Sequence, residues 1–411
     1  PAWPNSQVIG GIDQLLVVLP TKNTGRWWRK LPQGSRLQAL ARRKAAQKDA
    51  IVSTHLGNKR QTSIHVARAD TTQDAFASLS FARNLVDAAL REKAGSVGIW
   101  VLGFDDSTQT QLVEHVTAAA LAAAYPMPHF KEKASPTVVR SIKIIGVSER
   151  LDLSRVVAEA DGNNLARSLT ALPANKLDAV EYVKLLRELS KDNGWQFKKY
   201  GVRELKKMGA GAFLAVAQGN DDDSAAIVRI KYRPGDKNDS PRLCLVGKGI
   251  IFDTGGTNLK PFNSMLDMHI DMGGSAVAIG TLLSLSTLKV PFAIDCILAI
   301  TENRTGPKAY KSQDVITALN GKTIQTIHTD AEGRMALADA LTMACEDKPE
   351  LVVDYATLTG ACVNAVTTRY SGVFTNRSSL HPKLKKAGRD SGERVWPFPI
   401  GKEFIEDLKS E

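Results

Sequence analysis

Several features that define large protein classes are missing from this sequence of 411 residues. No apolar run is long enough to cross a bilayer, and residues 1–19 lack the basic-then-apolar order of a secretory signal. We therefore expect a cytoplasmic protein with no membrane partner. The four cysteines lie far apart and form no CxxC pair, which argues against a zinc knuckle or a redox site.

Three familiar catalytic signatures are absent as well. The sequence has no HExxH zinc helix and no GxSxG nucleophile elbow, and Gly321-Lys322-Thr323 lacks the earlier glycine of a phosphate-binding loop. The commonest signals for zinc-helix peptidases, α/β-hydrolases and P-loop nucleotide hydrolases are therefore missing.

The composition is that of an ordinary globular protein, with 43% hydrophobic and 24% charged residues. The chain is longer than a single hydrophobic core usually supports, which favours two domains. We expect an α/β fold with a smaller N-terminal α/β domain over residues 1–150 and a connecting helix over 151–170. A larger α/β domain around a central, mostly parallel sheet is expected over residues 171–411.

This fold class rests on the alternation of apolar strand-like runs with helical periodicity along the chain. In the first part we expect strands at 15–19, 63–67, 97–104 and 138–147, and helices at 72–93 and 109–124. After a helix at 153–169, we expect strands at 225–232, 243–246, 292–300, 324–327 and 351–355, with helices at 180–193, 274–288 and 334–346.

The net charge of +11 is concentrated at the start of the chain. Residues 1–60 hold eleven Lys and Arg against two Asp, a net charge of +9, and they include Trp27 and Trp28. Such a patch could bind nucleic acid through phosphate attraction and stacking, or it could be a solvated helix face. The sequence leaves both readings open.

Acidic residues that follow apolar strands are the first candidates for a functional site, because ligands of open α/β sheets gather at the carboxyl ends of the strands. Lys248 and Asp253 follow the strand predicted at 243–246, and Asp271 opens the next helix. Asp330 and Glu332 follow the strand predicted at 324–327. Taken singly, Asp271 is better explained as a helix cap, but the whole set favours a shared site.

In the run Asp330-Ala331-Glu332-Gly333-Arg334, charged residues alternate with small ones, which in an extended loop points the charges to one side. Four converging carboxylates repel one another unless cations neutralise them, and a pair of divalent ions is the usual solution. Two such ions can activate water and polarise a carbonyl group. Lys248 can bind a metal only as a neutral amine, so we expect burial and adjacent ions to lower its pKa.

Two further cations lie next to these acids in the sequence. Lys260 is a candidate for stabilising an oxyanion, and Arg334 for holding a small anion. The run 356–360, Ala-Thr-Leu-Thr-Gly, is a candidate for contacting a peptide, although a simple strand-to-helix turn fits it almost as well.

At this point the sequence resembles the leucyl aminopeptidases of peptidase family M17, which are cytosolic di-metal exopeptidases. The resemblance rests on residues 247–256 (GKGIIFDTGG), 259–261 (LKP), 271–274 (DMGG), 329–334 (TDAEGR) and 356–360 (ATLTG). It covers the chain well from about residue 164 onward.

The resemblance implies functional roles for these residues. Two zinc, manganese, cobalt or magnesium ions per subunit would be bound by Lys248, Asp253, Asp271, Asp330 and Glu332, with Asp253 and Glu332 bridging. Lys260 and Arg334 would be catalytic, with a bicarbonate on the arginine, and Met268, Thr357 and Leu358 would contact substrate. The resemblance further implies a homohexamer that cleaves short peptides and prefers N-terminal leucine-type residues.

Two departures from the family pattern stand out. His328 occupies a position where the family usually has Asn, and residue 411 falls short of the usual end of the catalytic domain, so we expect its C-terminal part to be missing. The alternative to an active aminopeptidase is a metal-binding family member with a nucleic-acid-binding or structural role and little turnover.

Overall fold

The computed structural model describes residues 6–22, 24–44, 50–92, 94–131, 139–147, 151–221, 224–235 and 241–409. The chain divides into two compact units, which we call unit 1 (residues 1–157 with 360–409) and unit 2 (residues 158–359). The domain boundaries expected from the sequence stay a prediction.

Unit 1 is built on a five-stranded sheet with the strand order β2-β3-β1-β4-β5. Strands β3, β1, β4 and β5 are parallel, and β2 pairs antiparallel with β3 at one edge. The strands are β1 (Gln14–Pro20), β2 (Val52–His55), β3 (Ser63–Ala69), β4 (Ser96–Val101) and β5 (Ser141–Ile145). Their continuous apolar runs fit a sheet that is covered on both faces.

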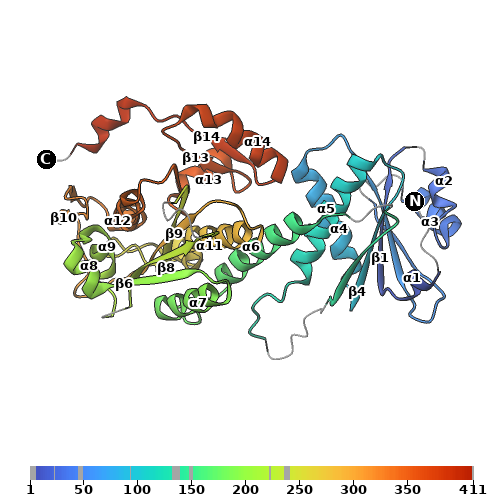
Figure 1. The fold of residues 1–411 in the computed structure, drawn as a ribbon, viewed down its shortest axis with the longest axis horizontal. Coiled ribbons are helices and arrows are strands. Elements are labelled where there is room, and N and C mark those ends of the chain that lie inside the picture. The colour runs from blue at the N-terminus through green and yellow to red at the C-terminus, as the bar shows by residue number, and fades with distance from the viewer. Residues whose placement is uncertain are drawn as a thin grey trace. The chain divides into compact units, whose positions relative to one another are not determined.

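Helices cover both faces of this sheet (Figure 1). On one face lie α4 (Ala75–Ala89) and α5 (Asp106–Ala124), and on the other lie α1 (Ser6–Gly10), α2 (Gly25–Trp28) and α3 (Gly34–Arg43). The two long helices begin at Asp74 and Asp105, whose carboxylates accept hydrogen bonds from backbone N–H groups in the first turn.

The segment 360–409 of unit 1 contains short elements. They are α13 (Gly360–Val366), β13 (Ser371–Val373), η3 (Ser378–Leu380), α14 (His381–Ser391), β14 (Val395–Pro397) and η4 (Lys402–Leu408). The two strands pair in parallel. The Arg394 guanidinium lies 3.9 Å from the ring centroid of Phe76 in α4 and 4.5 Å from that of Tyr370, which connects this segment to α4.

Unit 2 contains a second five-stranded sheet with the order β12-β8-β9-β7-β6. Strands β12, β8 and β9 are parallel, and β7 pairs antiparallel with both β9 and β6, so β7 alone of the five runs in the opposite direction. The strands are β6 (Gln196–Gly201), β7 (Ala226–Tyr232), β8 (Leu243–Asp253), β9 (Ile294–Asn303) and β12 (Leu351–Tyr355). The expected α/β class with a mostly parallel central sheet is confirmed.

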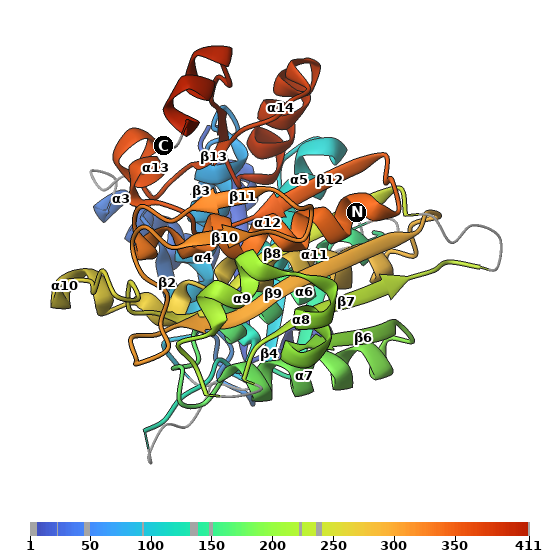
Figure 2. The same ribbon diagram turned by 90° about the vertical axis from the view of Figure 1, so that its left-hand side faces the viewer.

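This sheet also has helices on both faces (Figure 2). Helices α8 (Val202–Met208), α9 (Gly211–Ala217) and α12 (Glu332–Glu346) pack on one face, and α6 (Ser154–Thr170), α7 (Ala179–Asp192) and α11 (Gly273–Thr287) pack on the other. Ahead of α11 come α10 (Phe262–Met265) and the 3₁₀ helix η1 (Met268–Ile270). The stretch from Phe262 to Thr287 is long and apolar enough to cross a membrane, but it is half buried inside the fold, as core helices of globular domains also are.

One predicted strand has a different partner from the one expected. Of the residues predicted as strand 324–327, Ile324 and Gln325 lie in β11 (Thr323–Gln325), whereas Thr326 and Ile327 lie beyond it. Among the described residues, β11 pairs only with β10 (Val315–Thr317), in an antiparallel hairpin separate from the large sheet. Both strands are three residues long and contain no buried residue, so they lack the buried faces of a central strand. The inference that Asp330 and Glu332 follow a strand of the main sheet is therefore wrong.

Candidate metal centre

Strand β8 carries both Lys248 and Asp253, which are five residues apart. In a regular strand, residues at an odd separation point to opposite faces. Pairing of β8 with β9 is regular up to Ile250 and resumes at Asp253 opposite Asn303, so three steps along β8 match two along β9. This extra residue is a β-bulge, and it turns Asp253 to the side of Lys248.

Asp271 follows η1 and precedes α11, as the sequence suggested, but its carboxylate does not cap that helix. The N-cap position of α11 is Met272, and the Asp271 carboxylate instead accepts a hydrogen bond of 2.7 Å from the Thr357 hydroxyl. Thr357 lies just beyond β12, the strand next to β8. The capping interpretation of Asp271 is therefore wrong.

Asp330 and Glu332 reach the site from the start of a helix. Asp330 lies in the 3₁₀ helix η2 (Thr329–Ala331), and Glu332 is the first residue of α12. The expectation of an extended run with all charges on one side is wrong, because the chain is already helical here and Arg334 projects to an exposed position. The N-terminal end of α12 favours the negative charge of Glu332.

Lys248 is the centre of the buried part of the site. Its ammonium nitrogen lies 2.8 Å from Asp271 Oδ2, 2.8 Å from Glu332 Oε1 and 3.0 Å from the Thr357 carbonyl oxygen. Lys248, Asp253, Asp271 and Glu332 are all at most 4% exposed. A Cβ added to Gly333 would lie 2.7 Å from Lys248 Cε, so glycine at this position makes room for the lysine.

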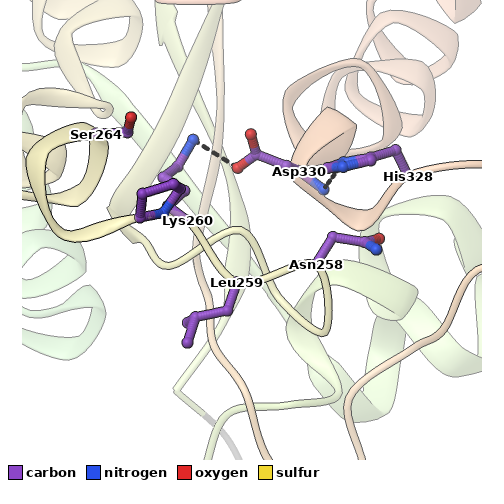
Figure 3. A pocket seen from close by; sticks show the side chains of 7 residues that line it. Asn258, Leu259, Lys260, Ser264, His328 and Asp330 are labelled. Atoms are coloured by element: carbon purple, nitrogen blue, oxygen red, sulfur yellow. Dashed lines mark hydrogen bonds and ion pairs between the residues drawn. The ribbon is translucent and has the colours of Figure 1, made fainter.

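Lys260 joins the other two carboxylates. Its ammonium nitrogen lies 2.8 Å from Asp253 Oδ2 and 2.5 Å from Asp330 Oδ1, the second of which is drawn in Figure 3. Burial by itself lowers the pKa of Lys260, but the bonds to Asp253 and Asp330 outweigh it and raise the pKa. The two lysines thus divide the four carboxylates into two pairs.

Burial has the largest effect on the pKa values of Asp271 and Glu332. It raises the pKa of Asp271, and the Lys248 ammonium offsets this in part. The pKa of Glu332 is raised by burial and by the negative charges of Asp253 and Asp271, again against Lys248. For Lys248, burial lowers the pKa, but Asp271 and Glu332 raise it by more. The sequence-based expectation of a lowered Lys248 pKa assumed neutralising cations, and the chain's own charges act in the opposite direction.

The residues present fit divalent cations. Asp253, Asp330 and Glu332 each offer one carboxylate oxygen, and these three atoms lie within 4.8 Å of one another. Glu332 Oε2 is buried and has no hydrogen-bond partner among the described residues. A buried, unpartnered carboxylate oxygen is costly, and oxygen ligands suit hard cations such as magnesium and manganese.

A cavity of ≈ 390 Å³ opens beside this cluster, lined by Lys260 and Asp330 together with Asn258, Leu259, Pro261, Ser264 and His328 (Figure 3). The exposed His328 accepts a hydrogen bond at Nδ1 from the backbone N–H of Asp330, at 3.2 Å. In the neutral ring this leaves the proton on Nε2. The cavity therefore has polar walls and direct access to two of the candidate residues.

The remaining predicted residues lie at or near this site. Leu358 is 44% exposed and close to Gly333, and Met268 begins η1, which packs against β8. Arg334 is exposed and forms no ion pair with the part of the chain that the structure describes.

Sequence analysis missed a set of uncharged residues behind the carboxylates. The Asn303 side-chain amide donates to Asp253 Oδ1 at 2.8 Å and to the Thr329 carbonyl at 3.1 Å, and the Tyr310 hydroxyl donates to the same carbonyl at 2.7 Å. Thr329 and Asn303 are fully buried. The sequence marks these residues only by their neighbours. Thr329 precedes Asp330 in the chain, and Asn303 lies opposite Asp253 across β8 and β9.

Comparison with known proteins places these features in context. The model of the cytosol aminopeptidase family, catalytic domain, matches residues 164–411. A probable cytosol aminopeptidase from Stutzerimonas stutzeri is 38% identical over 319 residues, which are 76% of this chain and 63% of that protein. The chain therefore spans less than two thirds of the length of this curated relative.

Solved structures with a similar fold support the same family assignment. The bottromycin maturation enzyme BotP in complex with Mn has a TM-score of 0.83 at 27% identity, covering 97% of this chain and 84% of its own. Leucyl aminopeptidase from Trypanosoma brucei, in complex with actinonin, has a TM-score of 0.82 at 27% identity, covering 97% and 80%. The resemblance inferred from the sequence motifs is confirmed: this chain belongs to the cytosol aminopeptidase family.

Proposed function

We propose that this chain is a metal-dependent aminopeptidase that releases N-terminal residues of the leucine type from short peptides. The observation that carries the proposal is the convergence of four carboxylates, three of them buried, around the buried Lys248, with Glu332 Oε2 left without a hydrogen-bond partner among the described residues. The cavity beside Lys260 and Asp330 supports it, because a peptide needs access to that cluster.

Lys248, Asp253, Asp271, Asp330 and Glu332 would hold two divalent ions, zinc or manganese by preference and magnesium or cobalt as alternatives. When bound, such ions lower the pKa of water and polarise a peptide carbonyl. In the metal-bound protein the cations, and not the Lys248 ammonium, would neutralise Asp271 and Glu332. Lys248 would then lose its proton and bind a metal as the neutral amine.

The chain's own cations would act on the substrate. Lys260 lies at the cavity wall, where its N–H groups can donate to the oxyanion of a tetrahedral intermediate. Arg334 is exposed and carries a guanidinium suited to a small anion such as bicarbonate, which could accept a proton from water. Met268 would line the pocket for the first side chain of the peptide, and Thr357 and Leu358 would contact the peptide through backbone groups.

Hydrolysis of leucine p-nitroanilide tests this function. We expect activity that is lost on treatment with a chelator and recovered on addition of manganese or zinc. Glu332→Ala is expected to abolish turnover and to weaken metal uptake. Full metal occupancy of the unchanged protein without any turnover would favour the alternative, in which the family fold has a structural role.

No observation favours the nucleic-acid alternative. Trp28 is 3% exposed and belongs to the core of unit 1, so it is not available to stack on a base. Arg26 and Lys30 lie over the ring of Trp27, at 4.5 and 5.4 Å from its centroid. Binding to nucleic acid through residues 1–60, hexamer formation and cytoplasmic location stay predictions, and salt-sensitive retention on DNA would test the first.

A further inference from the structure

Asn258 and Thr329 form a reciprocal pair of hydrogen bonds between two loops of the site. The Thr329 backbone N–H donates to Asn258 Oδ1 at 2.8 Å, and the Asn258 backbone N–H donates to Thr329 Oγ1 at 2.9 Å. The Thr329 hydroxyl lies 2.6 Å from the Gly255 carbonyl oxygen, to which it donates. Each side chain therefore bonds the backbone of the other loop, which fixes the two loops more closely than a single contact would.

The two loops carry the charged residues of the site. Asn258 comes two residues before Lys260, and Thr329 comes directly before Asp330 and three residues before Glu332. On its other side, the Thr329 carbonyl accepts from Asn303, whose amide also donates to Asp253. Thr329 is thus linked to Asp253 by hydrogen bonds through Asn303, to the loop of Lys260 by hydrogen bonds with Asn258, and to Asp330 by the peptide chain.

There is little room for these loops to shift. Gly256 adopts a left-handed conformation with φ of +67°, and an added Cβ there would lie 2.9 Å from both Asn303 Oδ1 and Thr329 Oγ1. Like charges at Asp253, Asp330 and Glu332 repel one another. Lys260 and Lys248 offset this repulsion, but their long side chains are flexible and do not fix the backbone of the two loops. Asn258, Thr329 and Asn303 are uncharged, and none of these three side chains belongs to the candidate ligand set.

We propose that the Asn258–Thr329 pair is a positioning device that holds the carboxylates of Asp253, Asp330 and Glu332 at the separation that divalent cations require. This inference rests on the proposed function. The competing explanation is a buried polar network that stabilises the fold and has no influence on the site.

The test compares Thr329→Val, which removes the hydroxyl at nearly constant volume, with Thr329→Ser, which keeps it. Manganese affinity is measured by calorimetry, and kcat and KM are measured with leucine p-nitroanilide. We expect Thr329→Val to weaken manganese binding about 10- to 100-fold, the usual effect of losing a group that orients metal ligands, and to lower kcat more than it changes KM. Thr329→Ser should restore both.

Asn258→Ala and the double variant complete a cycle. If the two side chains act as one unit, the double variant should bind manganese no more weakly than the worse single variant. Thr342→Val is the matched control, because among the described residues the Thr342 hydroxyl bonds only the Ala338 carbonyl, within α12. It should leave manganese affinity unchanged.

Normal manganese affinity and kcat in Thr329→Val and Asn258→Ala, with lowered thermal stability, would overturn the proposal in favour of a purely structural network. Should Thr329→Val fail to fold, Asn258→Ala decides the question, because Asn258 is only partly buried. An unchanged protein that binds manganese but does not hydrolyse the substrate would contradict the proposed function alone, and the affinity comparison would still decide on the pair. An unchanged protein that binds no manganese would overturn both.

Discussion

At the scale of single residues, Lys248 is a buried cation that compensates two buried anions. Its ammonium group contacts both Asp271 and Glu332, and all three side chains are nearly inaccessible to water. Removing one partner of a buried ion pair leaves an uncompensated charge, which costs far more than the loss of an exposed pair. The stability of the metal-free protein should therefore depend strongly on this one lysine.

We predict that Lys248→Met lowers the free energy of unfolding of the metal-free protein by about 3 to 5 kcal/mol at pH 7. Urea unfolding measures the change. Lys184→Met is the control, because Lys184 is exposed and its nitrogen lies 3.5 Å from Glu181, so its loss should cost less than about 1 kcal/mol. Equal decreases in the free energy of unfolding in the two variants would show that burial of Lys248 does not increase its contribution to stability.

The sequence predicted which charged residues gather at the site, because small residues and glycines around them leave a recognisable pattern. It could not predict their pairing, in which Lys248 contacts Asp271 and Glu332 while Lys260 contacts Asp253 and Asp330. Asn303, Thr329 and Tyr310 were missed as well. Uncharged residues that act through backbone carbonyls are common everywhere in proteins, so they give no signal until the loops are placed in space.

At the scale of elements, strands with buried apolar runs were predictable and strands with polar faces were not. Strand β6 contains Lys198 and Lys199 and lies at the edge of the unit 2 sheet, where side chains reach water, so it lacks the pattern of a central strand. Hairpin β10–β11 shows a second limit, because an apolar run predicts a strand but does not identify its partner.

Three elements of unit 2 are joined by a buried ion network. Arg229 in β7 contacts Asp295 in β9 at 2.7 Å and also Asp347 at the end of α12, and Arg233 contacts Asp295 at 2.6 Å. We predict that Asp295→Asn, which leaves two arginines without their shared anion, lowers the free energy of unfolding by about 3 to 5 kcal/mol. Asp87→Asn removes an exposed pair on α4 and should cost less than about 1 kcal/mol in the same urea titration.

In unit 1, His65 on β3 should make stability depend on pH. Burial lowers its pKa to about 4, so at neutral pH the ring is uncharged and bonds Ser53 and Gln14 at 2.8 Å each. In the unfolded chain the His65 ring takes up a proton near pH 6.5, whereas in the folded chain it stays neutral at that pH. The uncharged, hydrogen-bonded ring therefore makes its full contribution to folding stability above pH 6.5.

As the pH falls from 6.5 to about 4, the free energy of unfolding should decrease by up to about 3 kcal/mol, because the unfolded chain takes up a proton that the folded chain does not. Urea unfolding at pH 7 and at pH 4.5 measures the difference. His65→Gln has no group that titrates in this window and should show a smaller difference between the two pH values. A variant with the same pH dependence as the unchanged protein would show that His65 is not the group responsible.

At the scale of the whole molecule, all five candidate ligands belong to unit 2, whereas residues 1–157 contribute none of them. A ligand that binds only the folded state adds stability, about 2.7 kcal/mol at a concentration 100 times its Kd. Hydrogen exchange followed by mass spectrometry should therefore show protection by manganese in peptides covering β8, η2 and the start of α12. Peptides covering β1, β3 and β4 should exchange at the same rate with and without manganese, and equal protection in both units would contradict this localisation.

The bulge in β8 lets Lys248 and Asp253 share one face of the sheet although they are five residues apart. Deleting one residue at 251 or 252 would repair the ladder with β9, and the sheet itself would gain regular hydrogen bonds. Lys248 and Asp253 would then be four residues apart in a regular strand, an even separation that keeps both side chains on the same face. In a scan of single-codon deletions, we therefore expect this short stretch to yield folded proteins that still bind metal.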